Sequence, residues 1–195
     1  MSDRVLRGNE TVLLIPAYVD PLGNAQAIHS NGLTPLTSDG LTTTALNHWI
    51  PVTSSGHPNA SGGGNVSCAV KDDMTLGLTD SEADTDRVIC DVGQVEELTT
   101  KQFEAAMTGF RDKDLTANGA YNLFNKLTFA PDVPYIIAHR IGVKQTELAV
   151  VGERWDYYLV GTDVQIPAYA NGANITVGQT FIPKNIVQFA AELTA

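Results

Sequence analysis

The pattern with the most evident chemistry is a run of alternating carboxylates between residues 80 and 86. Calcium binds several oxygen ligands at once, and carboxylates at every second position can supply them. An EF-hand loop also needs glycine at its sixth position and glutamate at its twelfth, but counting from Asp80 these positions hold Thr85 and Asp91. We therefore predict no metal site and interpret the run as a solvated acidic turn or a surface facing a polyanion. Its members are Asp80, Glu82, Asp84 and Asp86.

No other motif predicts catalysis or a cofactor. The glycines at 62–64 are not followed by Lys and Ser or Thr, which a phosphate-binding P-loop requires. The four histidines lack the spacing of a zinc site, and we expect His139 to be packed or hydrogen-bonded on a strand. No Gly-x-Ser-x-Gly elbow is present. Since no nucleophile–base pair can be assembled, we predict that the protein is not an enzyme and needs no cofactor.

Aromatic residues in strand-like segments suggest one further kind of site. With carboxylates at 156 and 163 nearby, they could form a platform on which a carbohydrate ring stacks. Aromatic side chains in sheets more often fill the core or a subunit interface, and we favour that interpretation. A carbohydrate- or calcium-binding β-sandwich module remains an alternative. The residues concerned are Tyr135, Trp155, Tyr157 and Tyr158.

The composition indicates one globular domain over residues 1–195. The chain is 43% hydrophobic, which is enough for a sizeable buried core, and its formal net charge is −10. Its few cations are scattered, whereas non-specific nucleic-acid binding needs Lys and Arg on the phosphates. No apolar run approaches the ~20 residues that span a bilayer, so we expect no membrane association.

The N-terminal residues 1–4 lack an apolar signal segment, so we expect the protein to stay in the compartment where it is made. The two cysteines, Cys68 and Cys90, lie in apolar, strand-like contexts. We favour a reduced, buried pair over a disulfide, because structural disulfides belong mainly to exported proteins.

Short β-branched and aromatic segments with turn residues between them predict a mainly β fold, a sandwich or barrel. An apolar stripe predicts one short helix over residues 118–127, with Asn118 as its N-cap. The polar arm 1–10 and the Gly- and Ser-rich loop 53–65 are expected to be flexible. The predicted strands are residues 11–17, 74–79, 87–92, 134–140, 155–166 and 174–177.

Two segments fit either a helix or a strand. In residues 99–111, Phe103, Ala106, Met107 and Phe110 have helical spacing, but alternate residues could also form one face of a strand. Local propensity favours the helix slightly. Residues 181–193 are equally ambiguous, and residues 39–49 cannot be assigned from their pattern.

Four segments carry a resemblance to a known family. Residues 74–81 look like an early strand and acidic turn, and residues 103–112 look like a strand ending in an aromatic-Arg-Asp corner. Residues 121–124 fit a flanking helix, and residues 134–140 fit the next core strand. From about residue 67 onward, the chain thus resembles the major tail tube proteins of siphophages, particularly those that infect actinobacteria. The segment 21–65 departs from the family pattern.

The resemblance implies a β-sandwich with one helix, whose extended hairpin joins a continuous inner barrel in a ring of six subunits. It favours a strand over residues 103–110, because ladder partners in such a barrel override local propensity. An unpaired strand edge would be covered by the neighbouring subunit, and stacked rings would propagate into a tube. The inter-subunit strand is then expected to contain Phe103, Ala105, Met107 and Phe110.

The resemblance also implies a negative lumen that does not retain passing DNA. The expected partners are further copies of the chain, the tape-measure protein, the tail terminator and baseplate or tip proteins, in a virion tail made in the host bacterial cytoplasm. The arms 1–9 and 53–65 are candidates for bridging rings. Alternatives are a capsid decoration or head–tail joining protein. The candidate lumen carboxylates are Asp72, Asp73, Asp80, Glu82, Asp84, Asp86 and Glu104.

Overall fold

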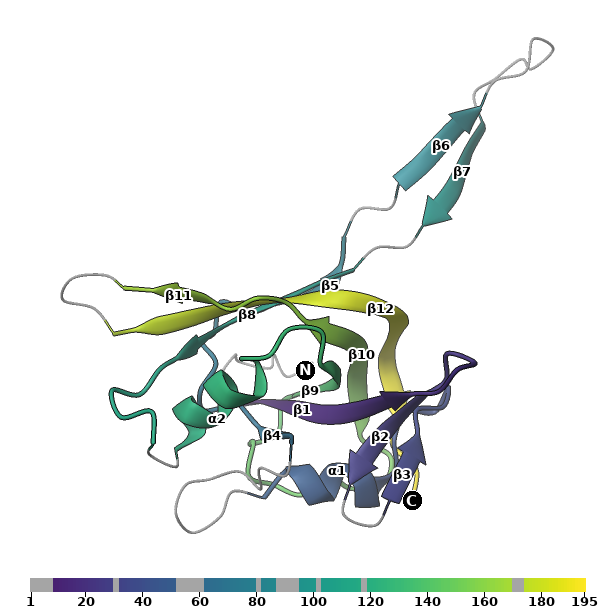
Figure 1. Cartoon of the computed structure of the whole chain (residues 1–195). Coiled ribbons are helices and arrows are strands. Elements are labelled where there is room, and N and C mark those ends of the chain that lie inside the picture. The colour runs from purple at the N-terminus through teal and green to yellow at the C-terminus, as the bar shows by residue number, and fades with distance from the viewer. Residues whose placement is uncertain are drawn as a thin grey trace, which may run out of the picture.

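A computed structural model describes residues 9–29, 32–51, 62–79, 82–86, 95–100, 103–116, 119–169 and 174–195. Within these residues the chain is mainly β, as predicted, with one large antiparallel sheet, a separate two-stranded hairpin and two short helices. Figure 1 shows the large sheet folded over on itself, with the hairpin projecting away from the body.

The lower half of the folded sheet has the order β3-β2-β1-β9-β10-β12. A short strand, β4, also pairs with β1. The central strands β1, β9 and β10 are antiparallel, and we call this part the lower half-sheet. Its strands are β1 (Glu10–Val19), β2 (Ala25–His29), β3 (Gly32–Pro35), β4 (Gly64–Asn65), β9 (Pro134–Ile141), β10 (Arg154–Thr162) and the C-terminal part of β12 (Thr176–Glu192).

The upper half-sheet has the order β11-β12-β8-β5 and uses the N-terminal part of β12. Residues 176–181 of β12 pair with β8, and residues 181–192 pair with β10, so this one strand belongs to both halves. The remaining strands are β5 (Thr75–Leu78), β8 (Phe103–Phe110) and β11 (Ile166–Ala168).

Two bulges allow β12 to bend between the halves, as its yellow ribbon does in Figure 1. The register with β10 shifts between Trp155 and Tyr157 and again between Tyr158 and Val160. At the first bulge Ala190 has a φ of 50°, and its N–H donates to Asp156 Oδ1 at 2.7 Å. Strands change sheets at such irregularities, because an extra residue breaks the flat ladder.

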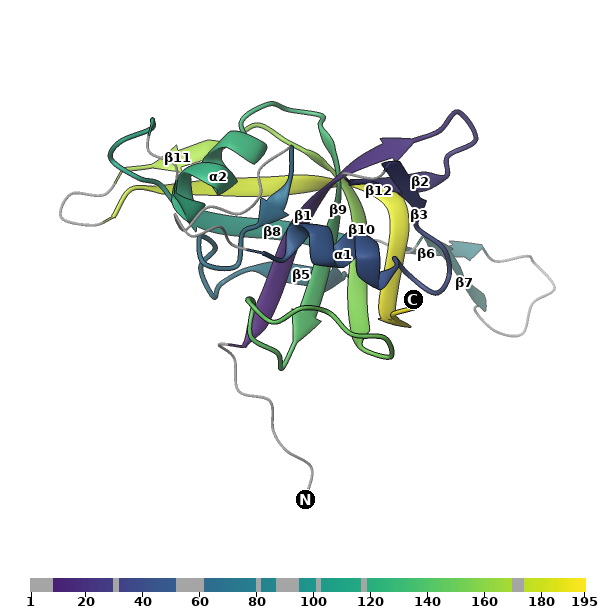
Figure 2. The same cartoon turned by 90° about the horizontal axis from the view of Figure 1, so that it is seen from below.

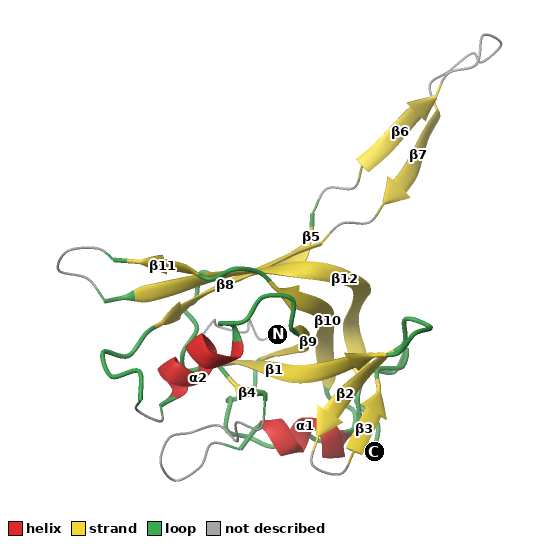
Figure 3. Ribbon diagram, in the orientation of Figure 1, coloured by secondary structure: helices red, strands yellow, loops and turns green. Residues whose placement is uncertain are grey.

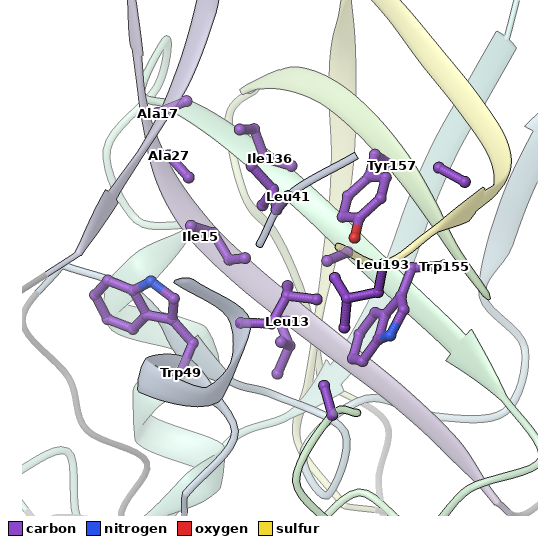
Figure 4. Packing of buried hydrophobic residues seen from close by; sticks show 14 of the residues in the cluster. Leu13, Ile15, Ala17, Ala27, Leu41, Trp49, Ile136, Trp155, Tyr157 and Leu193 are labelled. Carbon is purple, nitrogen blue, oxygen red and sulfur yellow. The ribbon is translucent and has the colours of Figure 1, made fainter. Parts of the chain in front are cut away.

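The central strands β1, β9 and β10 of the lower half-sheet are buried on both faces, which explains their apolar runs. On one face, Leu13 and Ile15 pack with Leu46 and Trp49 of α1 (Thr43–Trp49), as Figure 4 shows in part. Figure 2 shows α1 lying across β1, β9 and β10 on this side.

The other face of the lower half-sheet meets the upper half-sheet. Val12, Leu14 and Ile137 pack there with Met107 of β8 and with Phe124 of α2 (Ala120–Leu127). Figure 3 shows the two helices, in red, on different parts of this β framework.

The structure settles both ambiguous segments as strands. Residues 103–110 are β8, as the resemblance implied, and the segment 181–193 lies almost entirely in β12. The strand expected over 155–166 ends at Thr162 and resumes as β11 at Ile166. The strands predicted at 11–17, 74–79 and 134–140 correspond to β1, β5 and β9.

Some other sequence expectations were wrong, and some segments were unassigned or lie outside the described residues. The N-cap of α2 is Gly119, not Asn118, and its backbone geometry is extended without a side-chain cap. The unassigned segment 39–49 contains α1, whose N-cap Thr42 accepts a hydrogen bond from the Ala45 N–H at 3.3 Å. Cys68 is exposed in a turn rather than buried in a strand. Cys90, the strand predicted at 87–92 and most of the loop 53–65 lie outside the described residues.

Candidate assembly surface

The outward face of the upper half-sheet carries mainly small side chains, with Ile166 of β11 exposed opposite Gly178. Along β8, Phe103, Ala105 and Met107 are buried, whereas Glu104 points outward and is exposed. The register sets Gly77 opposite Glu104 and places Thr75 and Thr180 on either side of Ala106. Among the described positions of this face that lie between β5 and β12, Glu104 is the one charged residue. These positions are Thr75, Gly77, Glu104, Ala106, Thr108, Phe110, Thr176, Gly178 and Thr180.

The edges of this half-sheet are β5 and β11. Each has a single strand neighbour among the described residues, β8 and β12 respectively. The outer edge of β5 is therefore a row of backbone groups that another strand can pair with. Pro167 leaves β11 without one N–H, which limits but does not remove its pairing capacity.

The strand β8 itself is internal, because it pairs with β12 on one side and β5 on the other. Phe103 contacts Tyr158 with ring centroids 5.9 Å apart, and Phe110 contacts Tyr121 at 6.0 Å. The inter-subunit role predicted for Phe103, Ala105, Met107 and Phe110 remains a prediction, but the open edges of the half-sheet lie on other strands.

The predicted lumen carboxylates are not brought together as one cluster. Glu104 lies on the outward face, whereas Asp72 and Asp73 lie in the exposed turn before β5, where Asp73 forms an ion pair with Lys71 at 2.9 Å. Asp80 lies outside the described residues. The expected acidic turn is wrong for the rest of the run: Glu82, Asp84 and Asp86 belong to β6 (Glu82–Asp86), which pairs with β7 (Val95–Thr100).

A groove of about 620 Å³ lies beyond the C-terminal end of β8, beside α2. Residues 110–112 are the aromatic-Arg-Asp corner of the family resemblance, but their sequence pattern does not indicate that a groove lies there. The Arg111 guanidinium donates to the Tyr169 hydroxyl at 3.0 Å, and Lys113 is exposed. The lining residues are Phe110, Arg111, Asp112, Lys113, Tyr121, Asn174 and Ile175.

Comparison with known proteins decides between the functional classes. A profile of the phage tail tube protein family matches residues 59–195, well over half of the chain. The chain belongs to this family. No curated protein matches it. The match begins just before β4, so it includes the whole upper half-sheet, the hairpin of β6 and β7, and the central strands β9 and β10.

Membership of the tail tube family makes the protein a structural component of the virion tail and not an enzyme. Among the described residues, no group of three or more His, Cys, Asp and Glu could hold a metal ion. In the same part of the chain, no helix is both long and apolar enough to cross a membrane.

The aromatic residues considered as a ligand platform are core residues of this tail tube family member. Tyr135, Trp155, Tyr157 and Tyr158 are each at most 3% exposed. Burial raises the pKa of Tyr135 and Tyr158 to about 12, and it raises the pKa of Tyr157 as well. Because their faces pack against protein, they offer no stacking surface, which removes the basis of the carbohydrate interpretation.

The buried cation Arg140 fastens the loop between β9 and β10 to the sheet. Its guanidinium donates to Glu153 at 2.9 Å and to the carbonyl oxygens of Lys144 and Glu147 at 3.2 and 2.8 Å. It also lies 4.7 Å from the centre of the Trp155 ring. Its charge and donors are thus satisfied within the fold, so the residue supports structure and offers nothing to a ligand.

His139 is packed between strands, as expected. It is 7% exposed, with Nε2 3.5 Å from Glu10 of β1 and Nδ1 3.9 Å from Asp156 of β10. The three residues lie on adjacent strands of the lower half-sheet, so the histidine contributes to the packing of this layer.

Proposed function

We propose that the protein is the ring-forming subunit of a siphophage tail tube of an actinobacterial host, assembled in the host cytoplasm and stacked as hexameric rings around a tape-measure protein. The observation that carries this proposal is the upper half-sheet, which has open edges at β5 and β11 and an outward face of small residues. Family membership supports the tube, and the geometry suggests how the ring closes.

Strand direction favours closure through these two edges. Neighbouring strands of the upper half-sheet are antiparallel throughout, in the order β11-β12-β8-β5. Because this is an even number of strands, β5 of one subunit would run antiparallel to β11 of the next. A ring of any number of subunits would then form a fully antiparallel barrel, with no edge left exposed.

The positions of the two edges also suit a barrel. β5 lies opposite residues 103–106 of β8, whereas β11 pairs with the part of β12 opposite residues 108–110. The two edges are therefore offset along the strand direction. Closing a sheet into a barrel requires such a stagger between its ends.

The face of small residues would then line the lumen. Thr, Gly and Ala residues would form most of this wall, with Ile166 beside Gly178, and Glu104 would repeat once per subunit as a ring of negative charge. Carboxylates repel the phosphates of DNA, which supports passage of the genome without retention. The tail terminator and the baseplate or tip proteins would bind the two ends of the stack.

Electron microscopy of the purified protein, alone and with tail initiation proteins, tests the proposal. We expect hollow rings at low concentration and tubes when initiation proteins are added. A protein that stays monomeric at high concentration in the presence of those proteins would contradict the proposed assembly.

A further inference from the structure

The loop between β9 and β10, residues 142–153, carries three exposed aliphatic side chains in one short stretch. Leu148, Val150 and Val151 are each more than half exposed, whereas Ala149 between them is buried. Single exposed apolar residues are ordinary on a protein surface, but a group of large ones on one loop is typical of an interaction site. We call Leu148, Val150 and Val151 the loop patch.

Hydrogen bonds from three parts of the fold hold the loop patch in place. Asn47 of α1 binds both backbone groups of Ala149, accepting its N–H at 2.7 Å and donating to its carbonyl oxygen at 3.0 Å. The Gly152 N–H donates to the carbonyl oxygen of Leu193 at 2.9 Å, and Arg140 binds two earlier carbonyl oxygens of the loop. Because the backbone is already fixed, little conformational entropy would be lost when a partner covers the patch.

The loop patch lies on the same side of the molecule as the open edge of β5. Gln145 of this loop contacts the segment that leads into β5, with its Nε2 3.4 Å from Cys68 Sγ and its carbonyl oxygen accepting from Asn65 at 2.8 Å. Figure 2 shows the loop, in green, at the lower ends of β1 and β9, and β5 as the lowest strand of the upper half-sheet. A subunit that pairs with β5 would therefore also face the loop patch.

A second apolar surface lies beside the other open edge, at β11. Phe129 and Val164 are 73% and 65% exposed. They belong to adjoining loops, one after α2 and one between β10 and β11, and Gln165 joins these loops by donating to the Thr128 hydroxyl at 2.6 Å. Figure 2 shows both loops at the top of the view, on the side opposite to the loop between β9 and β10. We call Phe129 and Val164 the β11-side patch.

The placement of the two patches favours a second copy of the chain as the partner of each. They lie on opposite sides of the subunit, and each is next to one of the two edges whose pairing would close the barrel. In a ring the same side-to-side contact repeats around the axis, so one side of a subunit meets the opposite side of its neighbour. Both patches are apolar, so their contact would remove apolar surface from water on each side.

We propose that the loop patch of one subunit packs against the β11-side patch of the next subunit in the ring, beside the contact between β5 and β11. This inference rests on the proposed function, because it names a second contact between the same neighbours. Asn47, which fixes the loop, belongs to α1 and precedes the residues that the family profile matches. A part of the chain outside the family match thus supports the contact.

Opposite charges introduced on the two patches test this contact. One variant carries Val150→Asp, a second carries Val164→Lys, and a third carries both substitutions. Each single variant would bury an unpaired charge against the apolar surface of its neighbour, so we expect the protein concentration needed for rings to rise roughly tenfold or more. In the double variant each new carboxylate faces a new ammonium group of the next subunit, so ring formation should recover in part.

A matched control separates the contact from general effects of added charge. Leu33→Asp places a carboxylate on another half-exposed apolar side chain, on β3 at the outer edge of the lower half-sheet. It should leave ring formation unchanged. All the substituted side chains are exposed, so circular dichroism melting should show that each variant is folded.

Asn47→Ala tests the support of the loop separately. Loss of both hydrogen bonds to Ala149 should loosen the loop patch and raise the protein concentration needed for rings. The same substitution should add little in a chain that already carries Val150→Asp, because the contact is then already lost. Equal increases in the two backgrounds would show that Asn47 does not act through the loop patch.

Sedimentation velocity over a range of protein concentrations distinguishes the outcomes. Weaker ring formation by each single variant, with recovery in the double variant, supports the contact. Ring formation by either single variant at the concentration that suffices for the unmodified protein would overturn it. Losses that add in the double variant would also overturn it, since they are expected if each patch meets its own copy. If the unmodified protein forms no rings, the proposed function fails and this contact fails with it; if its rings are insensitive to the substitutions, this contact alone fails.

Discussion

Replacing Gly109 by alanine tests how α2 is fixed against the upper half-sheet. A Cβ at this position would lie 2.2 Å from Cδ1 and 2.6 Å from Cε1 of Phe124. Carbon atoms in contact lie roughly 3.5–4 Å apart, so the ring or the helix must move by about 1 Å or more. Phe124 is fully buried. Overpacking costs about 1–3 kcal/mol, and alanine recovers about 0.5–1 kcal/mol over glycine in a strand. We therefore expect a net loss of about 1 kcal/mol, the difference between the middles of these two ranges.

Urea denaturation followed by circular dichroism measures this loss as a lower midpoint. Gly77→Ala on the neighbouring strand β5 is the matched control, because its Cβ would meet no atom within 4 Å. It should stabilise the fold by about 0.5–1 kcal/mol. Phe124→Leu should relieve the clash, so the double variant should be more stable than the sum of the single losses predicts. A Gly109→Ala protein as stable as the Gly77→Ala control would refute the reasoning.

Three further predictions concern the lower half-sheet. Ala190→Gly should raise the free energy of unfolding by about 1 kcal/mol, because alanine is strained at a φ of 50°. An unchanged midpoint of urea denaturation would contradict this prediction. Arg140→Met should lower the free energy of unfolding by about 3 kcal/mol, since Glu153 and two loop carbonyls lose their donor. A loss no larger than for an exposed arginine would argue against a structural role for Arg140. Burial raises the pKa of Tyr135 and Tyr158 to about 12, so the free energy of unfolding should fall as pH rises above 10, where the unfolded phenols ionise first. Ionisation of all six tyrosines near pH 10 with the fold intact would contradict this.

The local sequence pattern predicted the strands that are buried on both faces. It failed for segments whose conformation depends on pairing with strands that are distant in the sequence. Residues 11–17 and 134–140 are β-branched and apolar, and they form β1 and β9. In β8 the helical spacing of Phe103, Ala106 and Met107 is real, but only alternate residues are buried because ladders with β5 and β12 hold the backbone extended. The sequence of residues 103–110 alone gives no information on which strands will pair with it, so only the family resemblance indicated a strand here.

Two misses have different physical causes. The helix α1 is only seven residues long and begins with two threonines, so its propensity is weak, and burial of Leu46 and Trp49 against the sheet stabilises it. The carboxylates of β6 predict a turn, because acidic residues are depleted in strands. Their pairing with β7 could not be anticipated from a segment so poor in β-formers.

The candidate assembly surface was predictable in part. Glu104 was named from the sequence, and the structure places it on the exposed face of the upper half-sheet. The open edges could not be found in this way, because they depend on the strand order and on the bend of β12 between the two halves. The groove at Arg111 depends on α2 lying beside the end of β8, which is also a tertiary feature.

Disulfide trapping between the two open edges tests the central claim most directly. With Cys68 and Cys90 replaced by serine, Thr75→Cys on β5 is combined with Ile166→Cys or with Ala168→Cys on β11, and the assembled protein is oxidised. If β5 of each subunit pairs with β11 of the next, a denaturing gel should show a ladder of covalent multimers that ends at the number of subunits in the ring, whereas each single-cysteine protein should give dimers at most. Rings visible by microscopy that yield no multimers from either pair would contradict the account.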